Sequence, residues 1–256
     1  MEKPKLTLST VDRALELADI LAHNNKMSAI EISNALGINR TGAYALLNSM
    51  MRNNFVEKDT ASGKYSLGYK FLELGSYYRY QYPFVTAAER GIYSISRKYK
   101  CQINLIVYKS PCTALLLLIK APEDRIRSAQ SVTRPAHITA GGKLLMAYLP
   151  QEKLEREINY IDFVQYARNT IMDRETLLKR IEEIRSKGYS IEIEEGINQT
   201  GCVAAPIRTM SGDVIASISL MMSAEEMKKN INEYLEVILN TAKDISIELG
   251  YNPYNK

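Results

Sequence analysis

The first fifty residues place apolar side chains at helical spacing between polar residues that start or end helices. In the first segment the apolar positions are Val11, Ala14, Leu15, Ala18, Leu21 and Ala22. Their three- and four-residue spacing is typical of one apolar helix face. Ser9 and Asp12 stand where a capping hydroxyl and a first-turn carboxylate are expected. A helix is therefore predicted over residues 10–23.

A second and a third helix are predicted on either side of Gly37. Ser28 and Glu31 form a capping-box pattern, so the second helix begins after Ser28 and turns Ile32, Ala35 and Leu36 inward. Gly37 suits the left-handed residue that ends a helix, and Asn39 suits the cap of the next one. The core positions of the third helix are Ala43, Leu46, Leu47 and Met50.

The opposite face of the third helix is small and almost uncharged. It carries Arg40, Thr41, Tyr44, Ala45 and Asn48. An ordinary surface helix more often carries several Glu and Lys, whereas short polar side chains behind one arginine favour close contact with base edges in the major groove. Gly42 costs the helix about 1 kcal/mol, which is easier to explain if another backbone comes close there.

A β-hairpin is predicted after the third helix. Phe55 and Val56, then Tyr65 and Leu67, flank a turn at 62–63. Lys58 and Lys64 lie near its tip, within reach of phosphates. Three helices and a hairpin define a winged helix-turn-helix; a helical cap whose hairpin only packs is the alternative. The predicted DNA-binding residues are Ser28, Asn39, Arg40, Thr41, Gly42, Tyr44, Ala45, Asn48, Lys58 and Lys64.

The rest of the chain is predicted to be a linker and a second domain. Residues 69–84 contain five tyrosines, and Pro83 should break any helix. This favours a linker helix over 69–82 whose tyrosines pack within the subunit or, as we prefer, at a subunit interface. Beyond it, short apolar strands alternate with amphipathic helices, and the last helix is predicted as one long segment from residue 224. We expect an α+β fold with domains at 1–68, 69–84 and 85–256, and a sheet covered on one face that holds a ligand at its edge.

Composition restricts the functional class without choosing it. The 256 residues are 46% hydrophobic with a net charge of +4, and the basic excess is not concentrated in the first eighty residues. No stretch approaches the about 20 apolar residues of a membrane span, and the first residues lack a signal-peptide pattern, so we expect a cytoplasmic protein that contacts no membrane. Three scattered cysteines fit reduced thiols, and neither a metal nor another cofactor is expected.

The segment "ITAGGKLL" (138–145) predicts an anion site. Thr139 can cap a helix whose first turn contains Ala140 and Gly141, and small residues there expose amides at the positive end of the helix dipole. A carboxylate-bearing metabolite is the natural ligand. The glycines would alternatively serve close helix–sheet packing, and Lys143 either adds charge or is a surface lysine.

Several long motifs resemble one family. "STVDRALELADIL", "EISNALGINRTGAYALLNSMMRNNFVEKD" and "GKYSLGYKFLELG" are similar to the DNA-binding half of the IclR (isocitrate lyase regulator) family of bacterial transcription factors. "RPAHITAGGKLLMAYLP" and "EEGINQTGCVAAPIRTMSGDVIASISL" resemble its effector domain. The resemblance implies a GAF-like effector domain, homodimers or homotetramers, and operator DNA binding controlled by a small molecule. The family's recognition helix is often more basic than this one, so the operator sequence does not carry over.

The resemblance also implies ligand-binding residues. They are Ile126, Ala140, Gly141, Glu192, Thr200, Cys202, Ser219 and Met221, and Ile126 is the least specific match among them. Thr139 is added because it is predicted to cap the helix that begins at Ala140. Glu192 would accept a hydrogen bond from a ligand, or be an ordinary exposed strand carboxylate. Cys202 is interpreted as a small pocket or core residue, and Met221 makes the pocket more apolar than in relatives with a polar side chain there.

Two other functions compete with this interpretation. A Cys202–His137 dyad would support an enzyme, but no third orienting group and no nucleophile-elbow motif accompany it, and the spacing carries no metal signature. A sensor controlled by a protein partner is the other alternative. The sequence favours a transcriptional regulator, not an enzyme, that binds double-stranded operator DNA and a small organic-acid or aromatic effector.

Overall fold

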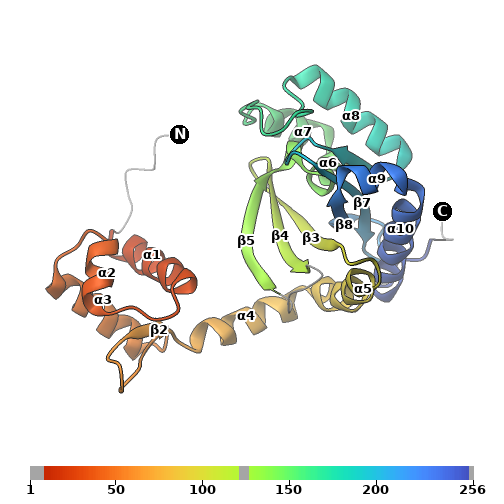
Figure 1. Cartoon of the computed structure of the whole chain (residues 1–256). Coiled ribbons are helices and arrows are strands. Elements are labelled where there is room, and N and C mark those ends of the chain that lie inside the picture. Colours follow the sequence, from red (N-terminus) through yellow and green to blue (C-terminus); the bar gives the residue numbers. More distant parts are fainter. Residues whose placement is uncertain (1–8, 121–126, 254–256) are drawn as a thin grey trace. The chain divides into compact units, whose positions relative to one another are not determined.

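The protein folds as two compact units. The structure, a computed structural model, describes residues 9–120 and 127–253, and its chain divides into Met1–Gln81 and Tyr82–Lys256 (Figure 1). Within the described residues, no helix has the length and apolar character needed to cross a membrane.

The first unit is a winged helix-turn-helix followed by a helix. Its elements are α1 (Ser9–His23), α2 (Ala29–Ala35), α3 (Arg40–Arg52), β1 (Val56–Lys58), β2 (Tyr65–Leu67) and α4 (Lys70–Gln81). Leu17, Leu21, Ile32 and Leu47 form its core together with Val56 of the hairpin. Pro83 ends this part of the chain as expected: α4 stops at Gln81, and Pro83 is the first residue of the next helix.

The predicted inward face of α1 is partly wrong. Val11, Leu15 and Ala22 are exposed, whereas Leu17 is fully buried. Apolar residues cover two adjoining stripes of this helix, and spacing alone does not say which stripe meets the core. Ala35 of α2 is likewise exposed.

The second unit is an antiparallel sheet between two layers of helices. Its helices are α5 (Pro83–Tyr99), the 3-10 turn η1 (Ala136–Ile138), α6 (Ala140–Ala147), α7 (Gln151–Ile158), α8 (Arg174–Lys187), α9 (Ala224–Lys229) and α10 (Ile231–Glu248). Its strands are β3 (Gln102–Lys109), β4 (Thr113–Lys120), β5 (Arg127–Pro135), β6 (Ser190–Ile193), β7 (Thr200–Arg208) and β8 (Val214–Ser223), in the order β5-β4-β3-β8-β7-β6.

Both faces of this sheet are covered, so the prediction of one covered face was wrong. Alternate residues of β3 separate the layers: Leu105 belongs to the core with α5, α9 and α10, and Ile106 to the core with α6, α7 and α8 (Figure 1). The strands carry apolar side chains on both sides of the sheet. The alternation of residues in the sequence had predicted an apolar face on one side only.

Three segments differ from the sequence prediction. Strand β5 and helix α7 were not predicted, and the single C-terminal helix is broken into α9 and α10 at Asn230. Asn230 leaves the helical conformation (φ −122°, ψ 27°), and its Nδ2 donates to Oε1 of Glu226 at 2.6 Å. Asparagine has a low helix propensity, and this interruption of the helical pattern falls on one.

Candidate functional site

Two capping arrangements hold the helix-turn-helix in place. Oγ of Ser28 accepts from the amide of Glu31 at 3.3 Å, and the Glu31 carboxylate accepts from the amide of Ser28 at 2.7 Å. Gly37 has φ +61°, the left-handed conformation expected at the end of α2. Oδ1 of Asn39 then accepts from the amide of Gly42 at 2.8 Å and starts α3. The sequence predicted each of these local features correctly.

Helix α3 presents the predicted polar face to solvent. Arg40, Thr41, Tyr44, Ala45 and Asn48 are all exposed, and the core positions opposite them are buried. Within the described residues, the close neighbour of Gly42 is a side chain and not a backbone. A Cβ there would lie 3.1 Å from Oδ1 of Asn39, and the chain brings no other backbone close among the described residues. The glycine therefore leaves room for the cap itself.

The wing is a short hairpin tied to the start of α2. β1 and β2 pair from Val56 with Leu67 to Lys58 with Tyr65, and a bridge joins Met27 to Tyr65. Lys58 is exposed, with its Nζ 5.4 Å from the Tyr65 ring centroid, whereas Lys64 is half-buried. Of the two predicted wing lysines, Lys58 is thus the freer to reach a phosphate.

A small cavity in the second unit collects the predicted ligand residues. Its volume is about 200 Å³. Every predicted ligand residue that the structure describes lines it: Thr139, Ala140, Gly141, Glu192, Thr200, Cys202, Ser219 and Met221. Ile126 lies outside the described residues. Sequence reasoning missed the other lining residues, Gln102, Asn104, Ile106, Arg134, Ile138, Gly196 and Ile197.

The cavity floor is a face of the sheet, not its edge as expected. Strand pairing sets Gln102, Met221, Cys202 and Glu192 side by side across β3, β8, β7 and β6. The next row joins Asn104 to Ser219. Nε2 of Gln102 donates to Oδ1 of Asn104 at 2.8 Å, and Nδ2 of Asn104 donates to Oγ of Ser219 at 3.2 Å. Gln102 and Asn104 alternate with apolar residues in β3, a polar signal that the sequence already carried.

The N-terminus of α6 forms one wall of this cavity. Oγ1 of Thr139 caps the helix by accepting from the amide of Gly142 at 3.0 Å. No acceptor within the described residues binds the amides of Ala140 and Gly141. A Cβ on Gly141 would lie 2.5 Å from Cδ1 of Ile106 and 2.6 Å from Oγ of Ser217. Gly141 therefore serves close helix–sheet packing at the same place where free amides face the cavity.

Glu192 is a buried acid, so its interpretation as an exposed strand carboxylate was wrong. Its side chain accepts from the amides of Glu195 at 2.5 Å and Gly196 at 3.2 Å. Burial raises the pKa of Glu192, and the charge of Lys143 and these two amides oppose the rise. The cavity thus has amides of α6 on one wall and a carboxyl group on another.

Lys143 is also buried, and its interpretation as a surface lysine was wrong. Its Nζ donates to Oε2 of Glu195 at 2.7 Å and to the carbonyl of His137 at 3.3 Å. Glu195 in turn accepts from Arg180 at 3.0 Å. Lys143 is committed to this network and does not line the cavity.

Cys202 and His137 lack the features of a catalytic dyad. Burial, followed by the charge of Glu192, raises the pKa of the Cys202 thiol to about 12, whereas a nucleophilic cysteine needs a lowered one. Both ring nitrogens of His137 are buried without a hydrogen-bond partner among the described residues, and its ring packs edge-on against Phe163 and Tyr166. Burial, followed by Lys143, lowers the pKa of His137 to about 4.

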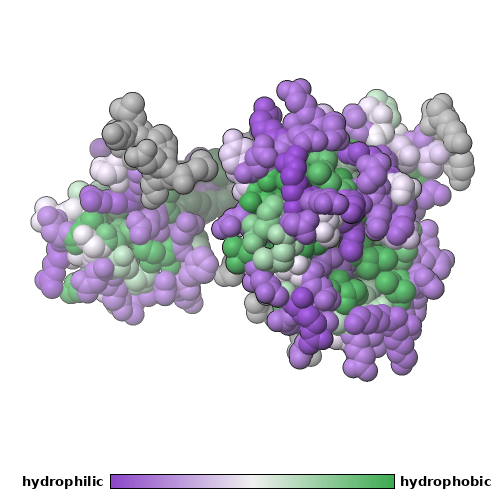
Figure 2. Space-filling view, turned by 90° about the horizontal axis from the view of Figure 1, so that it is seen from above, coloured by the Kyte–Doolittle hydropathy of each residue, from purple (hydrophilic) through white to green (hydrophobic). Residues whose placement is uncertain are grey.

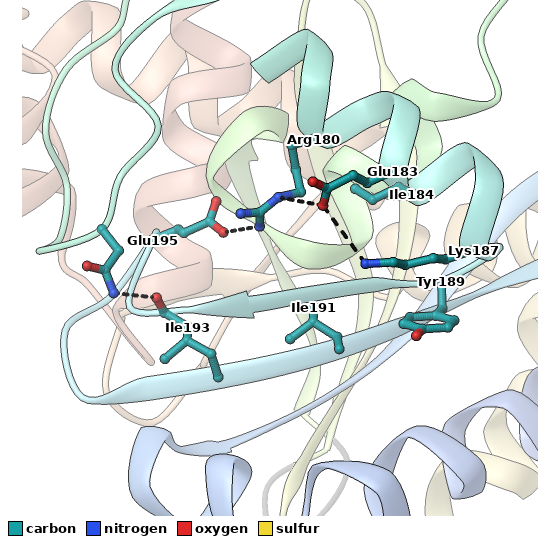
Figure 3. A pocket seen from close by; sticks show the side chains of 9 residues that line it. Arg180, Glu183, Ile184, Lys187, Tyr189, Ile191, Ile193 and Glu195 are labelled. Atoms are coloured by element: carbon teal, nitrogen blue, oxygen red, sulfur yellow. Dashed lines mark hydrogen bonds and ion pairs between the residues drawn. The ribbon is translucent and has the colours of Figure 1, made fainter. Parts of the chain in front are cut away.

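A second groove, of about 400 Å³, lies between α8 and the edge strand β6 (Figure 3). Arg180 and Lys187 extend over it, but both cations are paired. Arg180 lies 3.0 Å from Glu195 and 3.7 Å from Glu183, and Lys187 lies 4.0 Å from Glu183. Because both of these cations are paired, this groove is less suited to an anionic ligand than the smaller cavity.

A winged helix-turn-helix joined to a sheet domain with a small cavity is the arrangement expected of a ligand-responsive transcriptional regulator. Residues 80–247 match the family described as "Bacterial transcriptional regulator IclR C-terminal", and residues 10–60 match the IclR helix-turn-helix domain. The chain belongs to the IclR family of bacterial transcriptional regulators.

Individual relatives agree over almost the whole chain. The HTH-type transcriptional regulator KdgR of Escherichia coli (strain K12) is 24% identical over 256 residues, which cover 99% of this chain and 97% of KdgR. The HTH-type transcriptional repressor AllR of Salmonella typhimurium is 24% identical over 247 residues, covering 95% and 90%. The protein is thus similar over nearly its full length to proteins named as transcriptional regulators.

Solved structures share the fold. The crystal structure of the Thermotoga maritima IclR has a TM-score of 0.81 at 25% identity and covers 96% of this chain and 100% of that one. An IclR homolog from Microbacterium hydrocarbonoxydans, complexed with 4-hydroxybenzoate, has a TM-score of 0.80 at 18% identity, with 94% and 98% covered. The α+β architecture predicted from the sequence is confirmed.

Proposed function

We propose that a small carboxylate binds the cavity beneath α6 and thereby changes how the protein binds operator DNA through α3 and the wing. The observation that carries this proposal is the gathering of the predicted ligand residues from α6, β6, β7 and β8 around one cavity of about 200 Å³. That size lies below the about 300–1,000 Å³ typical of drug-sized ligands, and so favours a small aliphatic or single-ring acid.

The cavity offers opposite kinds of polar group to such an acid. The carboxylate would lie against the amides of Ala140 and Gly141, where the helix dipole favours negative charge, near Arg134 of β5. Glu192, the amide of Gln102 and Asn104 offer hydrogen bonds to the rest of the ligand. Apolar lining from Ile106, Ile138 and Met221 accommodates its carbon skeleton. No cofactor and no catalytic step is part of the proposal.

DNA binding is assigned to one surface of the first unit. The contacts come from the exposed face of α3, with Lys58 and Lys64 of the wing nearest the phosphates. Three of the predicted residues contribute indirectly, because their polar groups form the helix caps. Ser28 caps the start of α2, and Asn39 with the amide of Gly42 caps the start of α3. Arg40 has no ion-pair partner within the described residues and is free to bind DNA.

Self-association is the third part of the proposal. Apolar side chains remain exposed on α1, where Val11 is 51% and Leu15 64% exposed, and on α4, where Leu72 is 75% and Tyr80 86% exposed. Apolar groups are visible on the surface of both units in Figure 2. Exposed apolar patches mark protein interfaces, and a homodimer or homotetramer acting on near-palindromic DNA in the cytoplasm fits a bacterial regulator.

The effector site is tested by filling the cavity. Met221 lines it, and Met221→Trp adds bulk there; Met210→Trp adds the same bulk at a position that is 79% exposed. A thermal-shift screen would use acetate, lactate, pyruvate, succinate, benzoate and 4-hydroxybenzoate, with lactamide and benzamide as uncharged controls. We expect at least one acid to raise Tm of the wild type and of Met210→Trp but not of Met221→Trp. Equal shifts in both variants would place the acid elsewhere.

A further inference from the structure

Helix α3 carries a side-chain pattern suited to A·T base pairs. Thr41, Ala45 and Asn48 follow one another at i, i+4 and i+7, and Tyr44 lies beside them; all four are exposed. In the major groove, methyl-bearing and small side chains such as Thr and Ala contact the thymine methyl group, and Asn pairs with N6 and N7 of adenine. Guanine is most often read by Arg or Lys, and on this helix such residues stand only at its two ends, Arg40 and Arg52, with none among the residues between them.

Asn48 is free to read a base. Its side chain is exposed and makes no hydrogen bond with any other described residue. Asn53, one residue beyond the same helix, differs because its Nδ2 already donates to the carbonyl of Ser49 at 2.8 Å. The two asparagines are therefore both exposed, but only the side chain of Asn48 is free to form a hydrogen bond with a base.

The helix is rigid enough to keep Asn48 in register. Oδ1 of Asn39 fixes the start of α3, and Leu46, Leu47 and Met50 are buried on the far side. Arg40 and Asn48 are eight residues apart, which is roughly 12 Å along the axis. A helix that lies in the major groove therefore sets these two side chains against different base pairs.

We propose that the protein reads an A·T-rich operator half-site in which Asn48 bonds an adenine and Thr41 and Ala45 lie against thymine methyl groups. The inference rests on the proposed role of α3 as the DNA-contacting helix. Arg40 then binds at the edge of the half-site, away from the adenine that Asn48 contacts. Tyr44 covers the step between the two contacts with its ring.

Selection from a library of random DNA duplexes tests this readout and identifies the operator motif in the same experiment. The same selection would be run on four full-length proteins: the wild type, Asn48→Arg, Asn48→Ala and Asn53→Ala. The salt concentration would be about 0.15 M, at which charges are screened as under physiological conditions. We expect an A·T-rich wild-type motif with one invariant adenine. Asn48→Arg replaces that adenine by guanine, Asn48→Ala leaves the position degenerate and weakens binding about 10-fold or more, and Asn53→Ala selects the wild-type motif.

The outcomes separate this inference from the function on which it rests. A selective motif that stays the same in the wild type, Asn48→Arg and Asn48→Ala overturns the readout while leaving DNA binding intact. A selective motif rich in G·C pairs under the helix overturns it as well. No enriched motif with the wild type contradicts the DNA-contacting role of α3 itself.

Thymine contacts are tested on the DNA side. Replacing the thymines of the selected motif by deoxyuridine removes only their methyl groups, and we expect several-fold weaker binding by the wild type. Thr41→Ser keeps a hydroxyl and loses the side-chain methyl, so its binding should respond less to the same replacement. An identical response of Thr41→Ser and wild type at every thymine overturns the assignment of Thr41.

Discussion

Nζ of Lys143 lies 2.7 Å from Oε2 of Glu195, and the two side chains are 0% and 5% exposed. The pair joins helix α6, whose N-terminus lines the cavity, to the loop after β6, whose amides hold Glu192. An ion pair this deeply buried is poor evidence of net stabilisation, but removing one partner leaves an uncompensated charge. It therefore ties two cavity walls together.

Lys143→Met should lower the free energy of unfolding by about 1–3 kcal/mol, less than the loss for a buried charge left without any partner, because Glu195 keeps its pair with Arg180. Urea unfolding measures the change. Lys179→Met is the matched control, since its pair with Glu175 is exposed and such pairs contribute about 1 kcal/mol or less. Equal losses in the two variants would contradict the role given to Lys143.

His137 should make the second unit acid-sensitive. Its pKa is lowered to about 4 in the folded chain from an ordinary value of 6.5, so the unfolded chain takes up a proton first as pH falls. Stability is therefore lost between about pH 6.5 and pH 4, by on the order of 3 kcal/mol in total. His137→Leu, which cannot titrate, should lose less stability over that range.

Calorimetry at several pH values checks this difference. His23 is the other histidine of the chain and is exposed, so His23→Gln serves as the control and should follow the wild type. A His137→Leu protein with the wild-type pH profile would show that the buried ring is not the source of the acid sensitivity.

Loss of the α3 cap should destabilise the DNA-binding unit. Asn39→Ala removes the acceptor for the amide of Gly42 and should cost about 1 kcal/mol, whereas Asn39→Asp keeps the cap. Thermal unfolding of the first unit, followed by circular dichroism, measures both. If Asn39→Ala and Asn39→Asp melt alike, the side-chain cap is not what stabilises the helix.

Self-association should depend on the exposed stripe of α1. Leu15→Glu places a charge on an apolar position that is 64% exposed and should shift the protein toward monomer. Ile30→Glu makes the same change on α2, at a position that is 48% exposed. Sedimentation velocity would compare the two. Unchanged association of Leu15→Glu would move the interface away from α1.

Local signals explain why the helix-turn-helix could be predicted from the sequence. Ser28 with Glu31, and Asn39 with Gly42, are three residues apart, and their hydrogen bonds form within one helical turn. Gly37 needs only its own backbone to adopt positive φ. The exposed stripe of α1 was not predictable in the same way, because the choice between two apolar stripes depends on the fold.

The cavity was predictable only in part. Its α6, β6, β7 and β8 residues came from the family resemblance, whereas Gln102 and Asn104 needed the pairing of β3 with β8. The burial of Lys143 depends on Glu195, 52 residues away, and no spacing rule connects them. The sequence alone therefore did not predict which strands pair or which distant charges compensate each other.

The most direct test of the account is whether filling the cavity changes DNA affinity. The selected duplex would be titrated with full-length protein by fluorescence anisotropy, with and without a saturating amount of the carboxylate that raises Tm. We predict that Kd changes by about 5-fold or more for the wild type and for Met210→Trp, and stays constant for Met221→Trp. An unchanged Kd for the saturated wild type, or an equal response of Met221→Trp, would contradict control of DNA binding from this cavity.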